Sequence, residues 1–179
     1  MVVSADGRTT KGDDPNIYTW TSQEDQDHFF SLIAENNLII MGRKTYLAAG
    51  DKIRLSAERK RVVLTKNPKL YANLAVKGQL EFSSEQPLDL VSRLEDEGFT
   101  HALLVGGGTV NWLFLQSGLV NELLLTIEPV IFGTGHSLFA GPIDSLQLEL
   151  LEQKRLNDRG TTVMQYGVNY TQVTVRKFV

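Results

Sequence analysis

The sequence predicts a single α/β domain with a mixed, mostly parallel central sheet, flanking helices and antiparallel strands in its C-terminal third. Three observations support this prediction. Short apolar runs at residues 38–41, 61–65 and 102–105 are typical of strands buried on both faces. Amphipathic helical segments alternate with these runs, and the chain beyond residue 121 contains strand-like segments one after another. This order favours a parallel centre and an antiparallel edge, with helices on both faces.

The N-terminal elements follow from local signals. Residues 1–5 predict a short strand, and Asp6-Gly7 a turn after it. Ser22 is a helix N-cap, with Asp25 at the third helical position, for a helix that ends near residue 36. Apolar residues recur on one face of this helix at a spacing of three to four, namely Phe29, Phe30, Ile33 and Ala34.

The remaining elements complete one domain. Pro87 begins a helix that ends at Gly98, and a shorter helix is expected over residues 109–116, after a run of glycines. Strands are expected over residues 122–131, 146–154, 161–166 and 170–177, with a hairpin turn at residues 157–160. Neither an internal repeat nor a linker interrupts the sequence, so residues 1–179 are predicted to form one domain.

Composition narrows the possible functions. The chain has 179 residues, of which 42% are hydrophobic and 22% charged, as in ordinary globular proteins. It contains no cysteine, so disulfides, thiolate metal sites and cysteine nucleophiles are excluded, and its three histidines have no metal-binding spacing. No apolar run reaches the roughly 18 residues of a membrane span, and no secretory pattern opens the chain. We therefore expect a cytoplasmic enzyme or binding module without a metal.

Positive charge is concentrated in one segment. The whole chain carries a net charge of −3, which argues against general nucleic-acid binding. Residues 43–69, however, contain nine basic and two acidic side chains, a net charge of +7, so the rest of the chain carries −10. A basic patch on an acidic protein indicates either a compact polyanion, such as a phosphorylated cofactor, or a solvated charged loop.

The strongest local motif is a glycine run between a strand and a helix. Gly106, Gly107 and Gly108 follow the apolar residues 103–105, and Thr109 begins the helix. Free N–H groups and the helix dipole at such a junction bind anions, and glycine lets a pyrophosphate approach the main chain. A tight turn is the alternative, but three consecutive glycines exceed what one turn requires.

Two other strand ends carry cations and hydroxyl groups. Gly42, Arg43, Lys44 and Thr45 follow the strand at residues 38–41, and Thr65-Lys66 ends the next one. In an open α/β sheet, ligands bind beyond the carboxyl ends of the strands, so the three strand ends could converge on one nucleotide. Each motif alone is equally compatible with a capped helix and surface cations.

A third motif places an acid beside aromatic residues. Asp25 and Phe29 lie one helical turn apart, and Trp20 precedes them. In an apolar cleft, such a carboxyl group has a raised pKa and can hold or protonate a nitrogen heterocycle. The motif alone favours the simpler role of an acid in the first turn that complements the helix dipole.

Taken in order, these motifs resemble dihydrofolate reductase: Trp20, Asp25 and Phe29, then residues 40–46, 63–65 and 106–108. The segments 106–112, 118–123 and 129–133 resemble the pyrimidine reductase domain of riboflavin biosynthesis still more closely, and residues 4–8 match the opening motif of that family. The resemblance covers nearly the whole chain. It implies a dihydrofolate-reductase-like fold.

The resemblance also implies an NADPH-dependent reductase. It places the pyrophosphate near Gly107, Gly108 and Thr109, and the 2′-phosphate near Arg43, Lys44, Thr65 and Lys66. The expected substrate resembles 5-amino-6-(5-phosphoribosylamino)uracil, in which hydride would reach the ribosyl C1′ of a ring-opened imine. Asp25 and Asp6 are the expected catalytic groups. Substrate contacts are expected from Ser4, Asp6, Arg8, Trp20, Asp25 and Thr126.

Two departures from the family leave alternatives open. Pyrimidine reductases of this family usually carry a substrate-binding glutamate just before the glycine run, where this chain has Val105, and they carry an Asp-Asp-Pro-x-Leu segment where it has residues 46–50. Reduction of a C=N bond in a dihydrofolate or another pterin, and a non-catalytic NADPH-binding protein, are the alternatives. The related pyrimidine reductases are commonly dimers, so a homodimer is expected, with no nucleic-acid partner.

Overall fold

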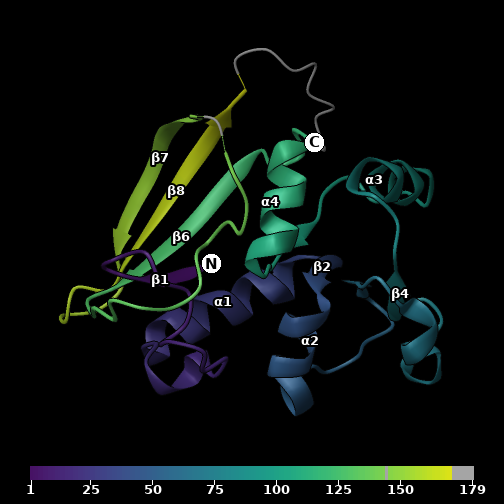
Figure 1. Cartoon of the computed structure of the whole chain (residues 1–179), viewed down its shortest axis with the longest axis horizontal. Helices are drawn as coiled ribbons and strands as arrows, with labels where there is room; N and C mark the ends of the chain where they lie inside the picture. The colour runs from purple at the N-terminus through teal and green to yellow at the C-terminus, as the bar shows by residue number, and fades with distance from the viewer. Residues whose placement is uncertain (144, 171–179) are drawn as a thin grey trace.

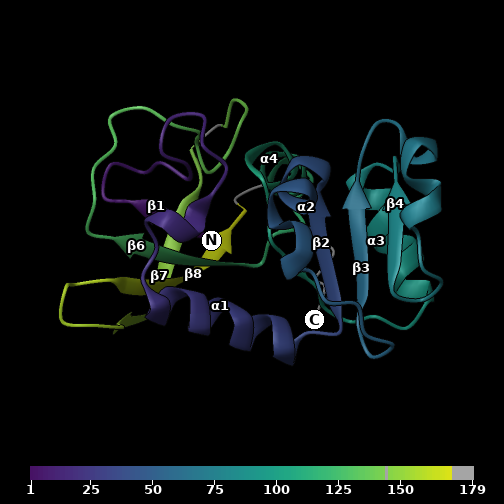
Figure 2. The same ribbon diagram turned by 90° about the horizontal axis from the view of Figure 1, so that it is seen from below.

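The computed structural model describes residues 1–143 and 145–170 of the chain, and it contains two four-stranded sheets. The first has the strand order β4-β3-β2-β5, and the second has the order β1-β6-β8-β7. The sheets lie beside one another, with α1 (Gln23–Glu35) running from one to the other (Figures 1 and 2). The predicted fold class, α/β with a mostly parallel sheet and antiparallel C-terminal strands, is confirmed.

The first sheet is entirely parallel and holds the core. It is built from β4 (Leu80–Ser83), β3 (Lys60–Leu64), β2 (Leu38–Gly42) and β5 (Leu103–Leu104). Every residue of β2 is buried, because this strand has a partner on each side and helices on both faces. This burial explains the uninterrupted apolar run in the sequence.

Helices cover both faces of this sheet. On one face, Leu38, Ile40 and Val62 pack against α3 (Pro87–Asp96) and α4 (Gly108–Gln116). On the other face, Ile39, Met41 and Val63 contact residues of α1 and of α2 (Arg43–Ala49), which are Ile33 and Tyr46. Figure 2 shows α2 and α3 on opposite sides of β3.

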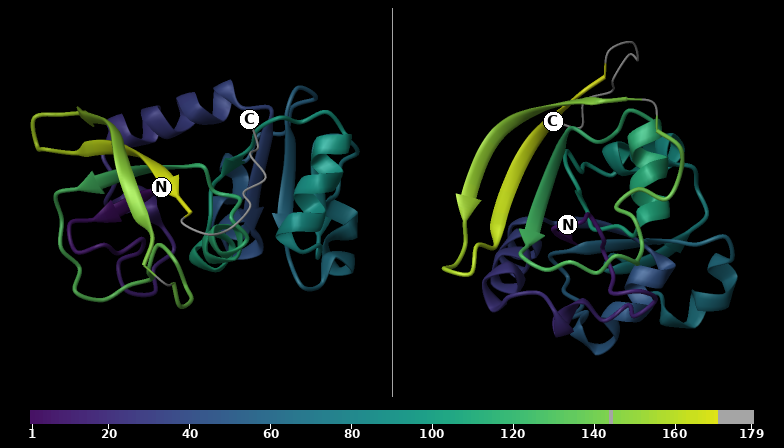
Figure 3. Two further views of the ribbon diagram at one scale, coloured as in Figure 1. Left: turned by 90° about the horizontal axis from the view of Figure 1, so that it is seen from above. Right: turned by 60° about the vertical axis from the view of Figure 1, so that its left-hand side comes forward.

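The second sheet is mixed. The short β1 (Val2–Ser4) pairs in parallel with β6 (Glu122–Glu128), whereas β8 (Thr162–Asn169) is antiparallel to both β6 and β7 (Gln147–Arg155). A turn at residues 157–160 joins β7 to β8, as predicted. All nine residues of β7 are exposed, and the strand forms the outer edge of the curved sheet (Figure 3).

The structure contains one strand that the sequence did not predict, and one predicted strand lies almost entirely outside the described residues. β4 was not predicted, because its four residues include Glu81 and Ser83 and so lack a continuous apolar pattern. The strand expected over residues 170–177 lies almost entirely outside the described residues. Only Tyr170 of this segment is described, and it is not part of a strand.

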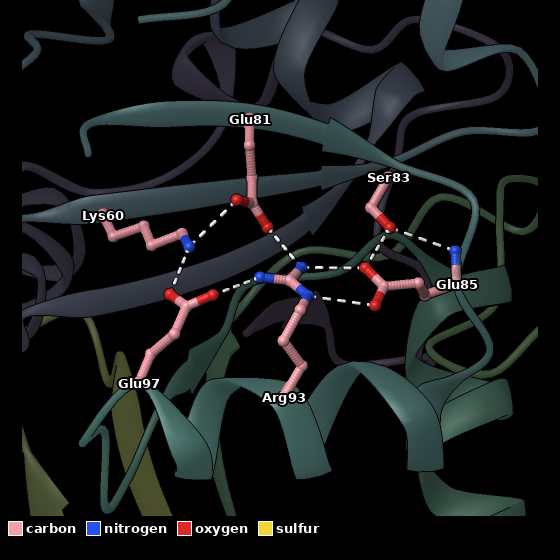
Figure 4. A network of polar contacts seen from close by, with 6 residues as sticks. All are labelled: Lys60, Glu81, Ser83, Glu85, Arg93 and Glu97. Atoms are coloured by element: carbon pink, nitrogen blue, oxygen red, sulfur yellow. Dashed lines mark hydrogen bonds and ion pairs between the residues drawn. The ribbon is translucent and has the colours of Figure 1, made fainter. Parts of the chain in front are cut away.

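A network of charged side chains joins β3, β4 and α3 at the edge of the parallel sheet (Figure 4). Arg93 of α3 forms ion pairs with Glu81, Glu85 and Glu97, at N–O distances of 2.5 to 2.8 Å. Lys60 contacts Glu81 at 2.9 Å and Glu97 at 2.6 Å. Because these side chains are only partly exposed, the network fixes α3 against the sheet and accounts for Glu81 in a strand.

Candidate functional site

The structure contains a large cleft with a volume of about 1340 Å³. Its walls come from both sheets and from α1, α2 and the start of α4. Pockets that hold a single drug-sized ligand typically measure roughly 300–1,000 Å³. The cleft therefore has room for two ligands at once, such as a nucleotide cofactor and a small substrate.

One part of the cleft lies at the carboxyl ends of the parallel strands. Because Gly42 at the end of β2 donates a hydrogen bond of 2.6 Å from its N–H to the carbonyl of Gly106, two of the predicted motifs lie side by side. Thr65, after β3, is tied by its N–H to the carbonyl of Ser83, at 2.9 Å. The predicted cofactor residues that line the cleft are Gly42, Arg43, Lys44, Thr45, Thr65, Lys66, Gly107, Gly108 and Thr109.

The glycine run has conformational and packing roles. Gly106 has a φ of +89°, a backbone conformation that favours glycine, and it does not line the cleft. A Cβ atom at residue 108 would lie 2.7 Å from the carbonyl oxygen of Ser137, so this position requires glycine for packing. Beyond it, the first turn of α4 leaves N–H groups without helical partners at the cleft. The run therefore serves as a tight turn and also as a potential anion site.

Three cations at this end of the cleft are available to a ligand. Arg43, Lys44 and Lys66 line the cleft, and none of them forms an ion pair with any residue that the structure describes. Cations beside free N–H groups at a helix start match the charge and the hydrogen-bonding needs of phosphate groups. The residues present at this end therefore fit a phosphorylated cofactor.

Asp25 occupies another part of the cleft, in the first turn of α1. Its side chain is 5% exposed, and it is the buried residue of a helix that otherwise lies near the surface. The N-cap Ser22 fixes this turn, since its hydroxyl oxygen accepts a hydrogen bond from the N–H of Asp25 at 3.2 Å. Burial raises the pKa of the Asp25 carboxyl, and a hydrogen bond from Thr126 opposes that shift. Such a group can retain a proton at a higher pH than an exposed aspartate can.

Glu128 supports this corner of the cleft, and the sequence reasoning missed it. It is 1% exposed. One carboxylate oxygen accepts a hydrogen bond from the N–H of Ser22 at 2.6 Å, and the other accepts one from the hydroxyl of Thr161 at 2.8 Å. Glu128 therefore ties the start of α1 to the second sheet. Its negative charge also contributes to the raised pKa of Asp25.

The structure places Asp6 outside the residues that line the cleft. Its carboxylate accepts hydrogen bonds from the hydroxyl of Ser4 at 2.7 Å and from the N–H groups of Phe132 and Gly133, at 3.1 and 2.7 Å. These bonds, of which that from Ser4 has the largest effect, lower the pKa of Asp6 to about 2. An ionised carboxylate that clamps the turn after β1 to the loop after β6 has a structural role, and its position does not support the predicted catalytic one.

The other predicted substrate residues divide in the same way. Thr126, which is 4% exposed, lines the cleft beside Asp25. Ser4 is fully engaged with Asp6 and with the N–H of Arg8. Trp20 packs edge-to-face on Phe132, with ring centroids 5.1 Å apart. Ser4, Arg8 and Trp20 are absent from the walls of the cleft, so their expected substrate contacts lack support from the geometry.

Several side chains in the cleft were not predicted from the sequence. His28 lies one turn after Asp25, and the spacing of three residues on one helix could have indicated it. Tyr18 and Lys52 meet across the cleft, with the Lys52 ammonium 2.8 Å from the centre of the Tyr18 ring. Arg61 of β3 also lines the cleft. Tyr18 and Lys52 are far apart in the chain, so no local pattern indicates their contact, and none indicates that Arg61 faces the cleft.

Residues 1–143 and 145–170 contain no cluster of three or more histidine, aspartate or glutamate side chains that could hold a metal ion. Within the same residues, every helix is too short or too polar to cross a bilayer.

A parallel sheet with a mixed sheet beside it, antiparallel strands in the C-terminal third and a cleft at the ends of the parallel strands are the arrangement of the dihydrofolate-reductase-like class of α/β proteins. Residues 1–162 match the RibD C-terminal domain, so the chain belongs to that family, a reductase domain of riboflavin biosynthesis. The resemblance noted in the sequence is thus confirmed.

Solved structures share the fold. A putative riboflavin biosynthesis protein from Shewanella sp. PV-4 is 21% identical, with a TM-score of 0.73 over 95% of this chain and 97% of that one. A pyrimidine reductase-like protein from Corynebacterium diphtheriae is 18% identical, with a TM-score of 0.73 over 94% and 90% of the two chains. In sequence, the chain is 23% identical to the uncharacterized protein YyaP of Bacillus subtilis (strain 168) in an alignment of 148 positions that covers 75% of this chain and 76% of YyaP.

Proposed function

We propose that this protein is an NADPH-dependent reductase that transfers a hydride to a small pyrimidine-type substrate resembling 5-amino-6-(5-phosphoribosylamino)uracil. The observation that carries the proposal is the position of Asp25, a buried acid with a raised pKa in the same cleft as the free cations and the glycine turn. Membership of the RibD C-terminal domain family supports the choice of reaction and substrate.

The cofactor end of the cleft binds and orients NADPH in this proposal. The N–H groups of the first turn of α4, around Gly107, Gly108 and Thr109, hold the pyrophosphate. The 2′-phosphate is held by side chains after β2 and β3, which are Arg43, Lys44, Thr65 and Lys66. When bound, NADPH supplies the hydride from its reduced nicotinamide ring.

Asp25 supplies the proton that the reaction requires. Reduction of a C=N bond adds a hydride to the carbon and a proton to the nitrogen. The protonated Asp25 carboxyl can hydrogen-bond to that nitrogen and protonate it, and its raised pKa keeps a larger fraction of the group protonated near neutral pH. Thr126, beside Asp25 in the cleft, fixes the orientation of the carboxyl group.

Val105 favours a second candidate, a reductase of a pterin-like C=N bond. Val105 is half-buried, lines the cleft and packs against the cluster that contains Ile39 and Met41. At this position the riboflavin-pathway reductases usually have a glutamate that binds the substrate. An apolar side chain there removes a polar contact expected for a phosphoribosylamino-pyrimidine and leaves Asp25 as the main polar group.

Oxidation of NADPH, followed by the absorbance of the reduced nicotinamide, distinguishes these candidates. The two substrates are 5-amino-6-(5-phosphoribosylamino)uracil, made fresh by a deaminase, and dihydrofolate. Turnover of the pyrimidine is expected, and turnover of dihydrofolate alone would favour the second candidate. If NADPH binds but neither substrate is reduced, the protein is a non-catalytic NADPH-binding protein or reduces another compound, and the proposed substrate is wrong.

A further inference from the structure

Arg61 is a buried cation in the cleft that the proposed reaction does not use. It is the second residue of β3, and it is 5% exposed. Because side chains alternate along a strand, Arg61 lies on the same face of the sheet as Val63. Ile33 of α1 and Ile53 pack on that face of the sheet. Both of them line the cleft, as Arg61 does.

The charge of Arg61 has no counterion among the described residues. Its Nη1 atom is buried without a hydrogen-bond partner, and no described carboxylate forms an ion pair with it. The neighbouring charge is another cation, Arg59, whose guanidinium donates to the carbonyls of Asn36 and Ala34 at 2.8 and 3.2 Å. A guanidinium group stays charged in proteins, and a buried charge without a partner is strongly unfavourable. The side chain is therefore placed to receive an anion.

The position of Arg61 separates it from the expected phosphate contacts of the cofactor. Those contacts follow the carboxyl end of β3, at Thr65 and Lys66. Arg61 lies four residues upstream, near the opposite end of the strand, a separation of about 13 Å at roughly 3.3 Å per residue. The main chain thus places Arg61 at a different part of the cleft from the expected phosphate contacts.

We propose that Arg61 forms an anion subsite in the cleft, which binds a carboxylate or phosphate group of the substrate. The cleft wall includes the apolar side chains of Phe30, Ile33 and Ile53, of which Ile33 and Ile53 pack on the sheet face that carries Arg61 and Val63. The substrate is thus a molecule with a polar ring for Asp25, an apolar or stacking segment, and an anionic group for Arg61. This description of the substrate rests on the proposed reductase function, whereas the anion subsite itself can be tested without turnover.

The test compares ligands that differ in charge but hardly in shape. The full chain is titrated calorimetrically with 4-phenylbutanoate, with its neutral amide 4-phenylbutanamide and with 3-phenylpropyl phosphate, in which a phosphate group ends the same three-carbon linker. A buried guanidinium that donates a charge-assisted hydrogen bond should increase the affinity for an anion. The anion with the higher affinity should therefore bind at least about tenfold more tightly than the amide. Whether that better anion is the carboxylate or the phosphate identifies the group that the subsite prefers.

Variants assign the effect to Arg61. Arg61→Gln should reduce the anion-to-amide ratio to about one, and Arg61→Lys should retain part of it because the charge remains. Arg54→Gln removes an exposed cation from the same basic segment and should leave the ratio unchanged. Circular dichroism verifies folding of each variant, and Arg61→Met, which also removes the charge, takes the place of Arg61→Gln if that variant does not fold.

Equal binding of amide and anions by the wild type, or a ratio that persists without a cation at residue 61, would overturn the proposal. NADPH affinity is measured in the same variants and should not change with Arg61→Gln. If the wild type selects anions through Arg61 but fails to bind NADPH, the anion subsite stands and the reductase function falls.

Discussion

Asp25 combines two properties that rarely occur together in a surface helix, burial and a titratable carboxyl group. Without a ligand, burial of the ionised form is unfavourable, which is why the pKa is raised. The unfavourable burial of this carboxyl group is tolerated because Ser22 and Glu128 hold this turn of α1 in place. A residue kept at an energetic cost and aimed into a cleft is a candidate for catalysis.

Replacement of Asp25 by asparagine tests its role as the proton donor. Asp25→Asn should lower kcat/KM about 10²- to 10⁴-fold, the usual contribution of general acid catalysis. The protonated form is the active one, so the wild-type rate should fall as pH rises through the pKa of Asp25, which lies above its ordinary value of 3.8. The measurement is kcat/KM as a function of pH.

Asp27→Asn is the matched control, because Asp27 is an exposed acid of the same helix. It should leave both the rate and its pH dependence unchanged. At neutral pH, Asp25→Asn should be at least as stable as the wild type, because it removes a buried ionisable group. Full activity of Asp25→Asn with an unchanged pH profile would exclude Asp25 as the proton donor.

At the scale of elements, α3 is held to the sheet by charge as well as by apolar packing. Arg93→Met leaves Glu81 and Glu97 with Lys60 as their described ion-pair partner, and Glu85 with none among the described residues. The expected loss in the free energy of unfolding is about 1–2 kcal/mol, between the values for exposed and buried pairs. Urea unfolding at neutral pH measures it, and Lys77→Met, at an exposed position, should change little.

The same network makes a pH-dependent contribution. Arg93 lowers the pKa of Glu85 in the folded protein, and Lys60 does the same for Glu97. Stability from a depressed carboxyl pKa is fully present above the unfolded value, near 4.5, and is lost as pH falls through the folded value. The difference between wild type and Arg93→Met should therefore shrink below about pH 4.5. A constant difference down to acidic pH would show that Arg93 stabilises by packing alone.

The edge strand β7 is the element best suited to the homodimer expected from the resemblance. Among the described residues it has a partner strand on one edge only, and it carries three exposed leucines, Leu148, Leu150 and Leu151, at 45%, 52% and 50% exposure. Such an edge favours pairing with another chain unless it is covered. We propose that a second copy of this chain covers it.

Sedimentation should therefore give the mass of a dimer, and the double variant Leu148→Lys/Leu150→Lys should give that of a monomer with an unchanged circular dichroism spectrum. The double variant Gln147→Lys/Gln153→Lys adds cations to polar positions of the same strand and should remain a dimer. A monomeric wild type, or a variant at the two leucines that remains dimeric, would contradict this assignment.

At the scale of the whole molecule, the sequence predicted the parts of the structure that depend on neighbouring residues. The apolar run of β2, the Ser22 cap and the turn at residues 157–160 are local signals, and each is confirmed. The strand-end motifs could be assigned to one cleft because the carboxyl ends of parallel strands share an edge.

What the sequence could not predict depends on contacts between distant segments. The clamp between Asp6 and Gly133 joins residues 127 positions apart, so a role in catalysis could not be distinguished from one in folding. The roles of Glu128 and Arg61 could not be predicted for a similar reason. Each is a charged residue of a strand, and only the tertiary structure shows that it is buried. β4 could not be predicted because Glu81 interrupts its apolar pattern, and the cation that pairs with Glu81 lies on α3, outside the local sequence.

In the proposed function, the cleft binds NADPH through the cations that follow β2 and β3. The most direct test compares the affinities for NADPH and NADH by fluorescence titration. NADPH should bind about tenfold more tightly or better, because the 2′-phosphate contacts Lys66 and its neighbours. Lys66→Ala should weaken NADPH binding and leave NADH binding nearly unchanged, whereas Lys77→Ala should affect neither. No binding of NADPH, or equal binding of both nucleotides that Lys66→Ala does not alter, would contradict the account.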